Sequence, residues 1–249
     1  MIMTEIRKKA REALQGKWGK GVGITSAYLA LFFIMGVIIG MFKEGSIIAK
    51  ILGIIELIVE IPLTLGFVYS FIKLKRNEEV EAFDFIKLGF ENFGRAWKLQ
   101  LRIVLKMILP IICLVVSISL FGTIILALVN GNGMTTPLFI TAIIVYIIGI
   151  FYSVVIGLLY TLTFMVAYDN PEMSSLEVVN RSAQLMYGHR GDYFVLSLSF
   201  IGWAVLCVFS FGIGLLWLAP YMQTSYTCFY EEVLKLKEPK KEEEKTKTE

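Results

Sequence analysis

Long apolar runs without charged residues alternate with short polar segments along this 249-residue chain. The last run, residues 193–230, contains no Asp, Glu, Lys, Arg or His. A straight helix of that length would measure roughly 57 Å, nearly twice the ~30 Å hydrocarbon core of a bilayer. Because Gly212 and Gly214 lie midway and glycine readily ends a helix, we predict a helical hairpin here.

The other apolar runs have lengths that suit membrane crossings. The predicted spans are residues 22–42, 51–72, 107–129 and 138–168, followed by the two limbs of the hairpin, 193–210 and 215–232. Residues 138–168 exceed the bilayer thickness, so we expect this span to tilt, protrude or bend near Gly149 or Gly157. The predicted fold class is all-α, a polytopic helical membrane protein with six transmembrane helices in one domain, residues 1–237. The charged tail, residues 238–249, is predicted to be disordered.

Three polar segments carry apolar side chains at helical spacing, which predicts three interfacial amphipathic helices on the cytoplasmic side. The first, residues 2–15, is basic and suits an anionic membrane surface; its apolar stripe is Ile2, Ile6, Ala10, Ala13 and Leu14. The second stripe is Phe83, Ile86, Phe90 and Phe93. The third is Leu176, Val179, Ala183 and Met186. Ser174 and Glu177 have the spacing of a capping box for this last helix, and Glu177 and Arg181 that of an i, i+4 ion pair.

The same order of elements occurs three times: an amphipathic helix, a glycine followed closely by a base, and two spans. The three junctions are Gly16-Lys17-Trp18, Gly94-Arg95-Ala96-Trp97 and Gly188-His189-Arg190. One interpretation is a threefold repeat of a helix-plus-hairpin unit. The alternative is that any membrane protein built from hairpins has interfacial helices at their ends.

The amino-acid composition excludes a soluble protein, and the distribution of basic residues predicts which side of the membrane holds the termini. Hydrophobic residues make up 56% of the chain and charged residues 18%, too apolar for a soluble domain of this length. Of the 24 Lys and Arg residues, all but Lys43 and Lys50 lie on the side of the predicted spans that holds both termini. The positive-inside rule therefore places both termini in the cytoplasm. Because this rule already explains the basic face, no nucleic-acid partner is expected.

Glu56 and Glu60 are acidic residues within an otherwise apolar run. A charged side chain at the bilayer centre costs roughly 2.5–3.5 kcal/mol on insertion scales, so such residues often mark ion or proton pathways. The alternative is a position near the outer interface, facing water. No basic residue lies within the other spans to pair with them, which disfavours a tightly coupled transporter.

A second candidate group follows the third amphipathic helix. Arg181, His189 and Arg190 are placed to face lipid phosphates or to cap helix ends, and a catalytic or metal-binding role for His189 is the weaker alternative. Trp18 and Trp97 suit the headgroup level of the membrane. The aromatic side chains of the last hairpin suit helix packing or interface anchoring, with a pocket lining as the alternative; they are Trp203, Trp217, Tyr221 and Tyr226.

Neither a cofactor nor a metal is expected from the sequence. Cys113, Cys207 and Cys228 all lie in apolar runs, without the paired spacing of a zinc site. There is no nucleotide-binding loop and no HExxH motif.

The segments RSAQLMYGHRGDYFVLSLSFIGWAVL and FGIGLLWLAPYMQTSYTCFYEEV, together with REALQGKWGKGVGI near the start, provide a resemblance. Here the chain resembles a bacterial family of integral membrane proteins catalogued as domain of unknown function 975. The resemblance implies a multi-pass protein of the bacterial cytoplasmic membrane. It implies no activity and no functional residues.

The function expected from these observations is non-enzymatic: membrane organisation, partner binding or regulation. The expected partners are the lipid bilayer, with anionic lipid headgroups at the cytoplasmic face, and either a second copy of the chain or another membrane protein. One alternative is a small transporter or channel that uses Glu56 and Glu60. A weaker alternative is a lipid-processing enzyme or accessory membrane domain that uses His189 and Arg190.

Overall fold

The computed structural model describes residues 3–43, 45–130 and 136–238. Within these ranges the regular structure is entirely helical, which confirms the all-α class. The helices are α1 Met3–Leu14, α2 Trp18–Gly40, α3 Ile47–Lys75, α4 Asp84–Glu91, α5 Phe93–Val129, α6 Thr136–Tyr160, α7 Thr163–Asp169, α8 Ser175–Met186, α9 Arg190–Leu198, α10 Ile201–Phe209 and α11 Leu215–Lys237. The predicted disordered tail, apart from Glu238, lies outside the described residues.

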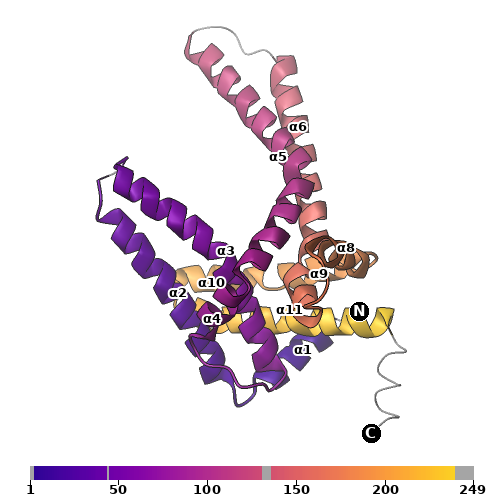
Figure 1. The fold of residues 1–249 in the computed structure, drawn as a ribbon. Helices are drawn as coiled ribbons and strands as arrows, with labels where there is room; N and C mark the ends of the chain where they lie inside the picture. Colours follow the sequence, from indigo (N-terminus) through magenta and orange to yellow (C-terminus); the bar gives the residue numbers. More distant parts are fainter. Residues whose placement is uncertain (1–2, 44, 131–135, 239–249) are drawn as a thin grey trace.

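Two long hairpins rise from a helical base and diverge (Figure 1). The first hairpin is α2–α3 and the second is α5–α6, continued by α7. The third hairpin consists of α9 and α10, which lead outward, and α11, which returns along the base and contacts α1, α2, α3, α8 and α10. We use "base" for α1, α4, α7, α8 and the C-terminal part of α11, residues 221–237, with the adjoining ends of the other helices.

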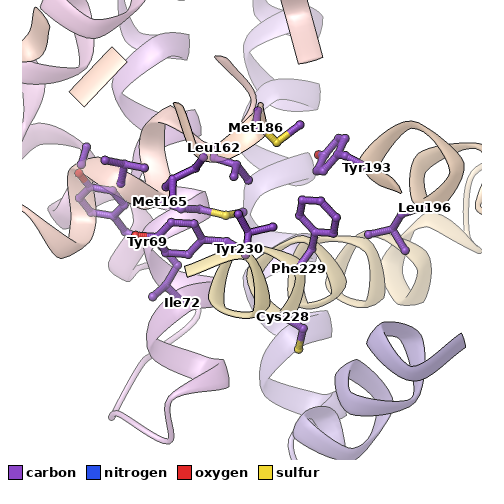
Figure 2. Close-up of a cluster of buried hydrophobic side chains, with 14 of the residues drawn as sticks. Tyr69, Ile72, Leu162, Met165, Met186, Tyr193, Leu196, Cys228, Phe229 and Tyr230 are labelled. Carbon is purple, nitrogen blue, oxygen red and sulfur yellow. The ribbon is translucent and has the colours of Figure 1, made fainter. Parts of the chain in front are cut away.

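The apolar core lies in the base rather than between the hairpins. Figure 2 shows side chains from several helices of the base pointing toward one another, among them Tyr69, Met165 and Phe229. Along α3 the buried side chains begin at Pro62 and continue to Leu74. The outer parts of the spans are exposed, and only 11% of the apolar window of α2 or of α5 is buried within the chain. The spans therefore present apolar side chains to their surroundings on nearly every side, as expected in lipid.

Within the described residues, five helical segments are long and apolar enough to cross a membrane, where we predicted six. They are Trp18–Gly40, Ile47–Lys75, Phe93–Val129, Thr136–Asp169 and Arg190–Phe209. The predicted span 215–232 is not among them. Its helix, α11, lacks charge up to Tyr230 but contains Gln223, Thr224, Ser225 and Thr227, and lack of charge is not the same as hydrophobicity.

Helices α1 and α11, the first and last of the described chain, lie close together, which restricts the number of crossings. Lys9 Nζ of α1 is 2.6 Å from Glu232 Oε2 of α11. An odd number of crossings would place these helices on opposite sides of a bilayer. Therefore α9–α10 and α11 either cross as a pair or do not cross at all.

Two of the predicted spans are interrupted. The span 193–210 breaks at Ser199–Phe200, between α9 and α10. The span 138–168 breaks at Thr161–Leu162, between α6 and α7, and not at Gly149 or Gly157. The hydroxyl of Thr163 donates to the carbonyl of Tyr160 at 2.6 Å and that of Thr161 to the carbonyl of Gly157 at 3.0 Å, so side chains satisfy backbone acceptors around the break.

The predicted turns agree well with the structure. Gly16 and Gly188, which follow α1 and α8, have φ of +75° and +85°, a region that glycine adopts without a steric penalty. The third hairpin reverses at Phe211 and Gly212, with φ of +50° and +84°. This is the position predicted from the glycine pair.

The surface helix predicted at the N-terminus is only partly correct. Helix α1 forms, but Ile6, Ala10 and Leu14 are at most 1% exposed. Helix α1 packs on α11, so this stripe contacts protein and not lipid. Ile2 lies outside the described residues.

The apolar stripe predicted for residues 83–93 is not the face that α4 buries most deeply against the protein. Phe83 and Phe90 are exposed, whereas the side chain of Phe85 is fully buried and Gly89 is buried with it. Helix α4 uses this other face because it packs on α3.

Helix α8 has the predicted capping box. The Glu177 backbone N–H donates to Ser174 Oγ, and the Ser174 N–H donates to Glu177 Oε2 at 2.8 Å. Val179 and Met186 of the predicted stripe are buried, but Leu176 is exposed. Glu177 and Arg181 do not form the expected ion pair with each other. Glu177 caps the helix instead, and Arg181 pairs with Glu238.

The crossing of α3 and α4 depends on two glycines. A Cβ on Gly66 would collide with the carbonyl oxygen of Phe85, and a Cβ on Gly89 would lie 2.5 Å from that of Pro62. Both obstacles are backbone atoms of a helix, which cannot rotate away. The two helices therefore approach more closely than any larger residue allows.

We predict that Gly66→Ala lowers the free energy of unfolding by at least about 2 kcal/mol, because α3 and α4 must separate. The matched control is Gly53→Ala on the same helix, where a Cβ meets nothing within 4 Å. Alanine there should be neutral or stabilising by less than about 1 kcal/mol. Thermal unfolding in mild detergent measures both changes, and equal midpoints for the two variants would contradict the prediction.

Candidate functional site

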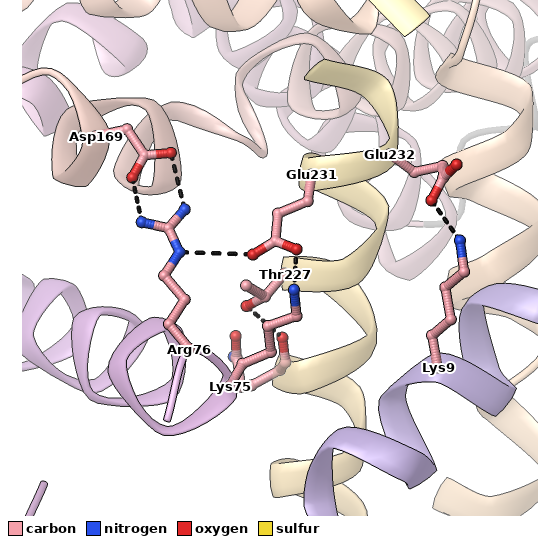
Figure 3. Close-up of polar contacts among 8 residues, drawn as sticks. Lys9, Lys75, Arg76, Asp169, Thr227, Glu231 and Glu232 are labelled. Carbon is pink, nitrogen blue, oxygen red and sulfur yellow. Dashed lines mark hydrogen bonds and ion pairs between the residues drawn. The ribbon is translucent and has the colours of Figure 1, made fainter. Parts of the chain in front are cut away.

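A cluster of charged side chains joins the ends of the three hairpins (Figure 3). Arg76, just after α3, forms two parallel hydrogen bonds with the carboxylate of Asp169 at the end of α7, at 2.6 and 2.9 Å. Its Nε lies 3.5 Å from Glu231 of α11, and Lys75 pairs with the same glutamate. Tyr230 donates to Asp169 at 2.9 Å. We call Lys75, Arg76, Asp169, Tyr230 and Glu231 the junction cluster.

The electrostatics of the junction cluster favour a structural role. The hydrogen bonds to Asp169 raise the pKa of Arg76, so the guanidinium stays charged. Burial raises the pKa of the Tyr230 hydroxyl, and the charge of Asp169 raises it further, so this group is a neutral donor near neutral pH. Two cations face two carboxylates, and the principal donors and acceptors are used in pairing.

The glycine-base junctions predicted from the sequence have related roles in the first two hairpins. Lys17 donates to the carbonyl of Leu74 at 3.1 Å, at the end of α3. Arg95 donates to the carbonyls of Asn170 and Pro171 at 2.6 and 2.5 Å, just after α7. In each case a cation at the start of the outgoing helix binds the carbonyls at the end of the returning one, where the helix dipole is negative.

The third junction is different. His189 Nδ1 lies 3.2 Å from Asp192, one turn further along the same helix. The guanidinium of Arg190 lies over the Tyr187 ring, 5.8 Å from its centroid. Neither residue is bonded to the carbonyls at the end of α11 in the contacts that the structure describes. Of the three units in the predicted repeat, two therefore share this polar contact.

The acidic candidates lie away from the junction cluster. Glu56 is half-buried and Glu60 is exposed, both in the half of α3 that projects beyond the base. Within the described residues neither carboxylate has an ion-pair partner. They are accessible from the surroundings of the chain, and the structure does not bring them together with the other predicted site residues.

Trp97 has a specific contact that the sequence alone did not predict. Its indole Nε1–H donates to the carbonyl of Ile58 on α3 at 3.1 Å. Proline at position 62 has no N–H to offer this carbonyl, so Trp97 supplies a donor where the helix lacks one. The pair Pro62 and Trp97 thereby joins the first and second hairpins.

The largest change to the predicted site comes from an apolar cleft of about 520 Å³ between α1, α2, α10 and α11. Trp18, Trp203, Trp217 and Tyr221 line it, so several aromatic side chains of the last hairpin line a cavity, which was the alternative interpretation. Arg7 and Arg11 lie at the α1 side of the cleft, and the sequence analysis did not single them out. Their i, i+4 spacing was the available signal.

A second apolar cavity, of about 540 Å³, lies between α6 and α9. Arg190 is the charged residue in its lining. The Nε atom of this arginine is buried without a hydrogen-bond partner among the described residues. Of the basic candidates from the sequence, Arg190 lines this apolar cavity, whereas Arg181 lines a separate hollow beside Glu172 and Glu177 and is paired with Glu238.

Metal or thiol chemistry finds no site in the part of the chain that the structure describes. No three His, Cys, Asp or Glu side chains there are close enough together to hold a metal ion. Cys207 and Cys228 are buried, and Cys113 is partly buried, all as free thiols.

We predict that the Arg76–Asp169 pair contributes a coupling free energy of about 1–3 kcal/mol in a double-mutant cycle with Arg76→Gln and Asp169→Asn. Both side chains are less than one third exposed, and the contact has two parallel hydrogen bonds. The control cycle uses Lys8 and Glu12, which are 71% and 58% exposed and 3.9 Å apart, with an expected coupling below about 0.5 kcal/mol. Denaturant unfolding in detergent provides the free energies, and similar values for the two pairs would refute the assignment.

We also predict that Trp97→Phe costs about 1–2 kcal/mol of stability in the natural chain but clearly less in a Pro62→Ala background. Alanine at position 62 restores the N–H that can donate to Ile58, so the indole donor is no longer needed. The same unfolding assay on the four proteins of this cycle tests the idea. An equal cost of Trp97→Phe in both backgrounds would show that the indole contributes only packing.

Comparison with known proteins identifies the family. No curated protein and no solved structure matches the chain. A family model described as protein of unknown function (DUF975) matches residues 1–237. Because this match covers all but the last residues of the sequence, the chain belongs to the DUF975 family.

Proposed function

We propose that this protein is a non-enzymatic membrane protein that organises or regulates other components of the bacterial cytoplasmic membrane. The observation that carries the proposal is the contrast between the base and the hairpins. The charged groups of the junction cluster are consumed in pairing within the base, whereas the diverging hairpins keep extensive apolar faces without an intramolecular partner (Figure 1). Such faces suit contacts with lipid and with other membrane helices.

The proposed orientation places the base and both termini in the cytoplasm. Lys43 and Lys50 lie at the far end of the first hairpin, and every other Lys and Arg of the sequence lies on the base side of the proposed crossings. The positive-inside rule supports this arrangement. With Lys9 of α1 paired to Glu232 of α11, an even number of crossings is required, and we propose that the third hairpin enters the membrane as a pair of helices.

The transporter alternative has less support from the geometry. A conduit needs helices that surround a path, but the first two hairpins diverge above the base (Figure 1). Glu60 is exposed and not enclosed between helices. The enzyme alternative is weaker still, because the polar partner that the structure gives His189 is the acidic Asp192 and not a nucleophile. Substitution of Glu56 and Glu60 tests the transporter alternative, and substitution of His189 tests the enzyme alternative.

Site-specific photocrosslinking in native membranes tests the proposal. A photoreactive phenylalanine analogue at Phe33 of the first hairpin and at Phe151 of the second, which are 73% and 70% exposed, should form discrete adducts with protein at one or both positions. The control position is Tyr187 at the end of α8, which is 71% exposed but belongs to the base. Adducts with lipid alone at both hairpin positions would reject the partner-binding function.

A flux assay addresses the rival function directly. Proteoliposomes containing the natural chain should show no more proton or cation leakage than protein-free liposomes. Leakage that is present in the natural chain and lost in the Glu56→Gln/Glu60→Gln variant would instead establish a conduit.

A further inference from the structure

The cleft between α1, α2, α10 and α11 is chemically divided along its length. Its basic end is formed by Arg7 and Arg11 of α1, beside Tyr221. Along α11 it continues from Tyr221 to Gly214, about two helical turns or roughly 10 Å. This outer part has apolar walls, among them Leu206 and Leu218. The order is cationic at the base and apolar toward the tip of the third hairpin.

Among the described residues, no carboxylate forms an ion pair with either arginine. The Nε of Arg7 is buried without a hydrogen-bond partner in the described chain, and a buried unpaired polar group is costly. Arg11 donates to the neutral hydroxyl of Tyr221 at 3.0 Å. The neighbouring lysines of α1 have acidic partners, Lys9 with Glu232 and Lys8 with Glu12, so the arginines differ from their surroundings.

An anionic phospholipid matches this arrangement more closely than other ligands. Its phosphate can accept parallel hydrogen bonds from guanidinium groups, and its acyl chains can cover the apolar walls. A free phosphate would leave these walls uncovered, and a neutral lipid would leave the net charge of the arginines unopposed. Trp203 and Trp217, each about half exposed, flank the cleft in the way that tryptophans line the headgroup boundary of a bilayer.

We propose that this cleft binds the phosphate and the upper acyl chains of one anionic phospholipid from the leaflet that faces the base. Arg7 and Arg11 hold the phosphate, and the walls along α10 and α11 hold the chains. The proposal rests on the membrane placement given under the proposed function, but it does not depend on any protein partner of the hairpins.

Native mass spectrometry of the delipidated full chain in detergent tests the site with phosphatidylglycerol as the probe. Arg7→Gln/Arg11→Gln should lower phosphatidylglycerol retention roughly tenfold, since each cation contributes to binding an anionic lipid. The matched control, Lys8→Gln/Lys20→Gln, removes the same charge from exposed positions and should change retention less than twofold. Equal losses in the two variants would show diffuse surface attraction and overturn the site.

Further measurements with other probes identify the class of ligand. Phosphatidylcholine should be retained several-fold less than phosphatidylglycerol, and excess glycerol phosphate should not displace bound lipid. Equal retention of both lipids, or displacement by glycerol phosphate, would reject an anionic lipid as the occupant. Leu206→Asn, at a 58% exposed wall position, should also weaken retention because it makes the wall polar.

The single variant Arg7→Gln guards against misfolding, because the Nε of Arg7 has no hydrogen bond in the described chain to lose. It should retain the natural unfolding midpoint and still lose lipid. The Phe33 and Phe151 crosslinks, measured in the Arg7→Gln/Arg11→Gln background, separate the two proposals. Loss of lipid with unchanged protein adducts supports the lipid site independently of partner binding. Unchanged lipid retention in this variant overturns the lipid site, whatever the adducts show.

Discussion

The bidentate contact between Arg76 and Asp169 is the interaction on which the arrangement of the hairpins depends. Lipid provides no hydrophobic driving force between helices, because its chains are as apolar as the side chains. The outer parts of the first two hairpins diverge, so their relative positions must be fixed elsewhere. The base supplies this in two ways: burial of apolar side chains around α11, and ion pairs that specify which helix ends meet.

The contacts at the hairpin ends follow a common logic. Each returning helix ends with carbonyls that have no partner within the helix, and these are costly to leave unsatisfied. Lys17 and Arg95 satisfy such carbonyls in the first and second hairpins, from the position just after the glycine that begins each unit. In the third hairpin the role is reversed, because Lys237, the last residue of α11, donates to the carbonyls of Gln184 and Tyr187 at the end of α8. A cation again satisfies carbonyls at a helix end, but here it comes from the last residue of the unit and not from its start.

The sequence was sufficient for features that depend on one segment alone. Apolar length predicted helices over most of the spans, glycines predicted the turns, and Ser174 with Glu177 predicted a cap that the structure contains. Features that depend on a distant partner were predicted poorly. The buried face of α4 is set by the close approach of α3 at Gly66, and nothing in residues 83–93 records that contact. The sequence also gives no sign of the junction cluster. In the sequence its charged residues near the span ends look like ordinary loop charges, and the fold places Lys75, Arg76 and Asp169 beside α11.

The two cavities have a common physical origin in the way the third hairpin joins the base. Helices α9, α10 and α11 turn away from the direction of the other hairpins, so side chains cannot fill the spaces along both sides (Figure 1). One space lies against α1 and α2 and the other against α6, and each contains an arginine whose Nε is buried without a partner in the described chain. In water, a protein with such gaps would lose stability through unsatisfied polar groups and lost packing. A membrane surface offers molecules with a charged head and apolar chains at that depth, so gaps of this composition are tolerable for a chain that is always surrounded by lipid.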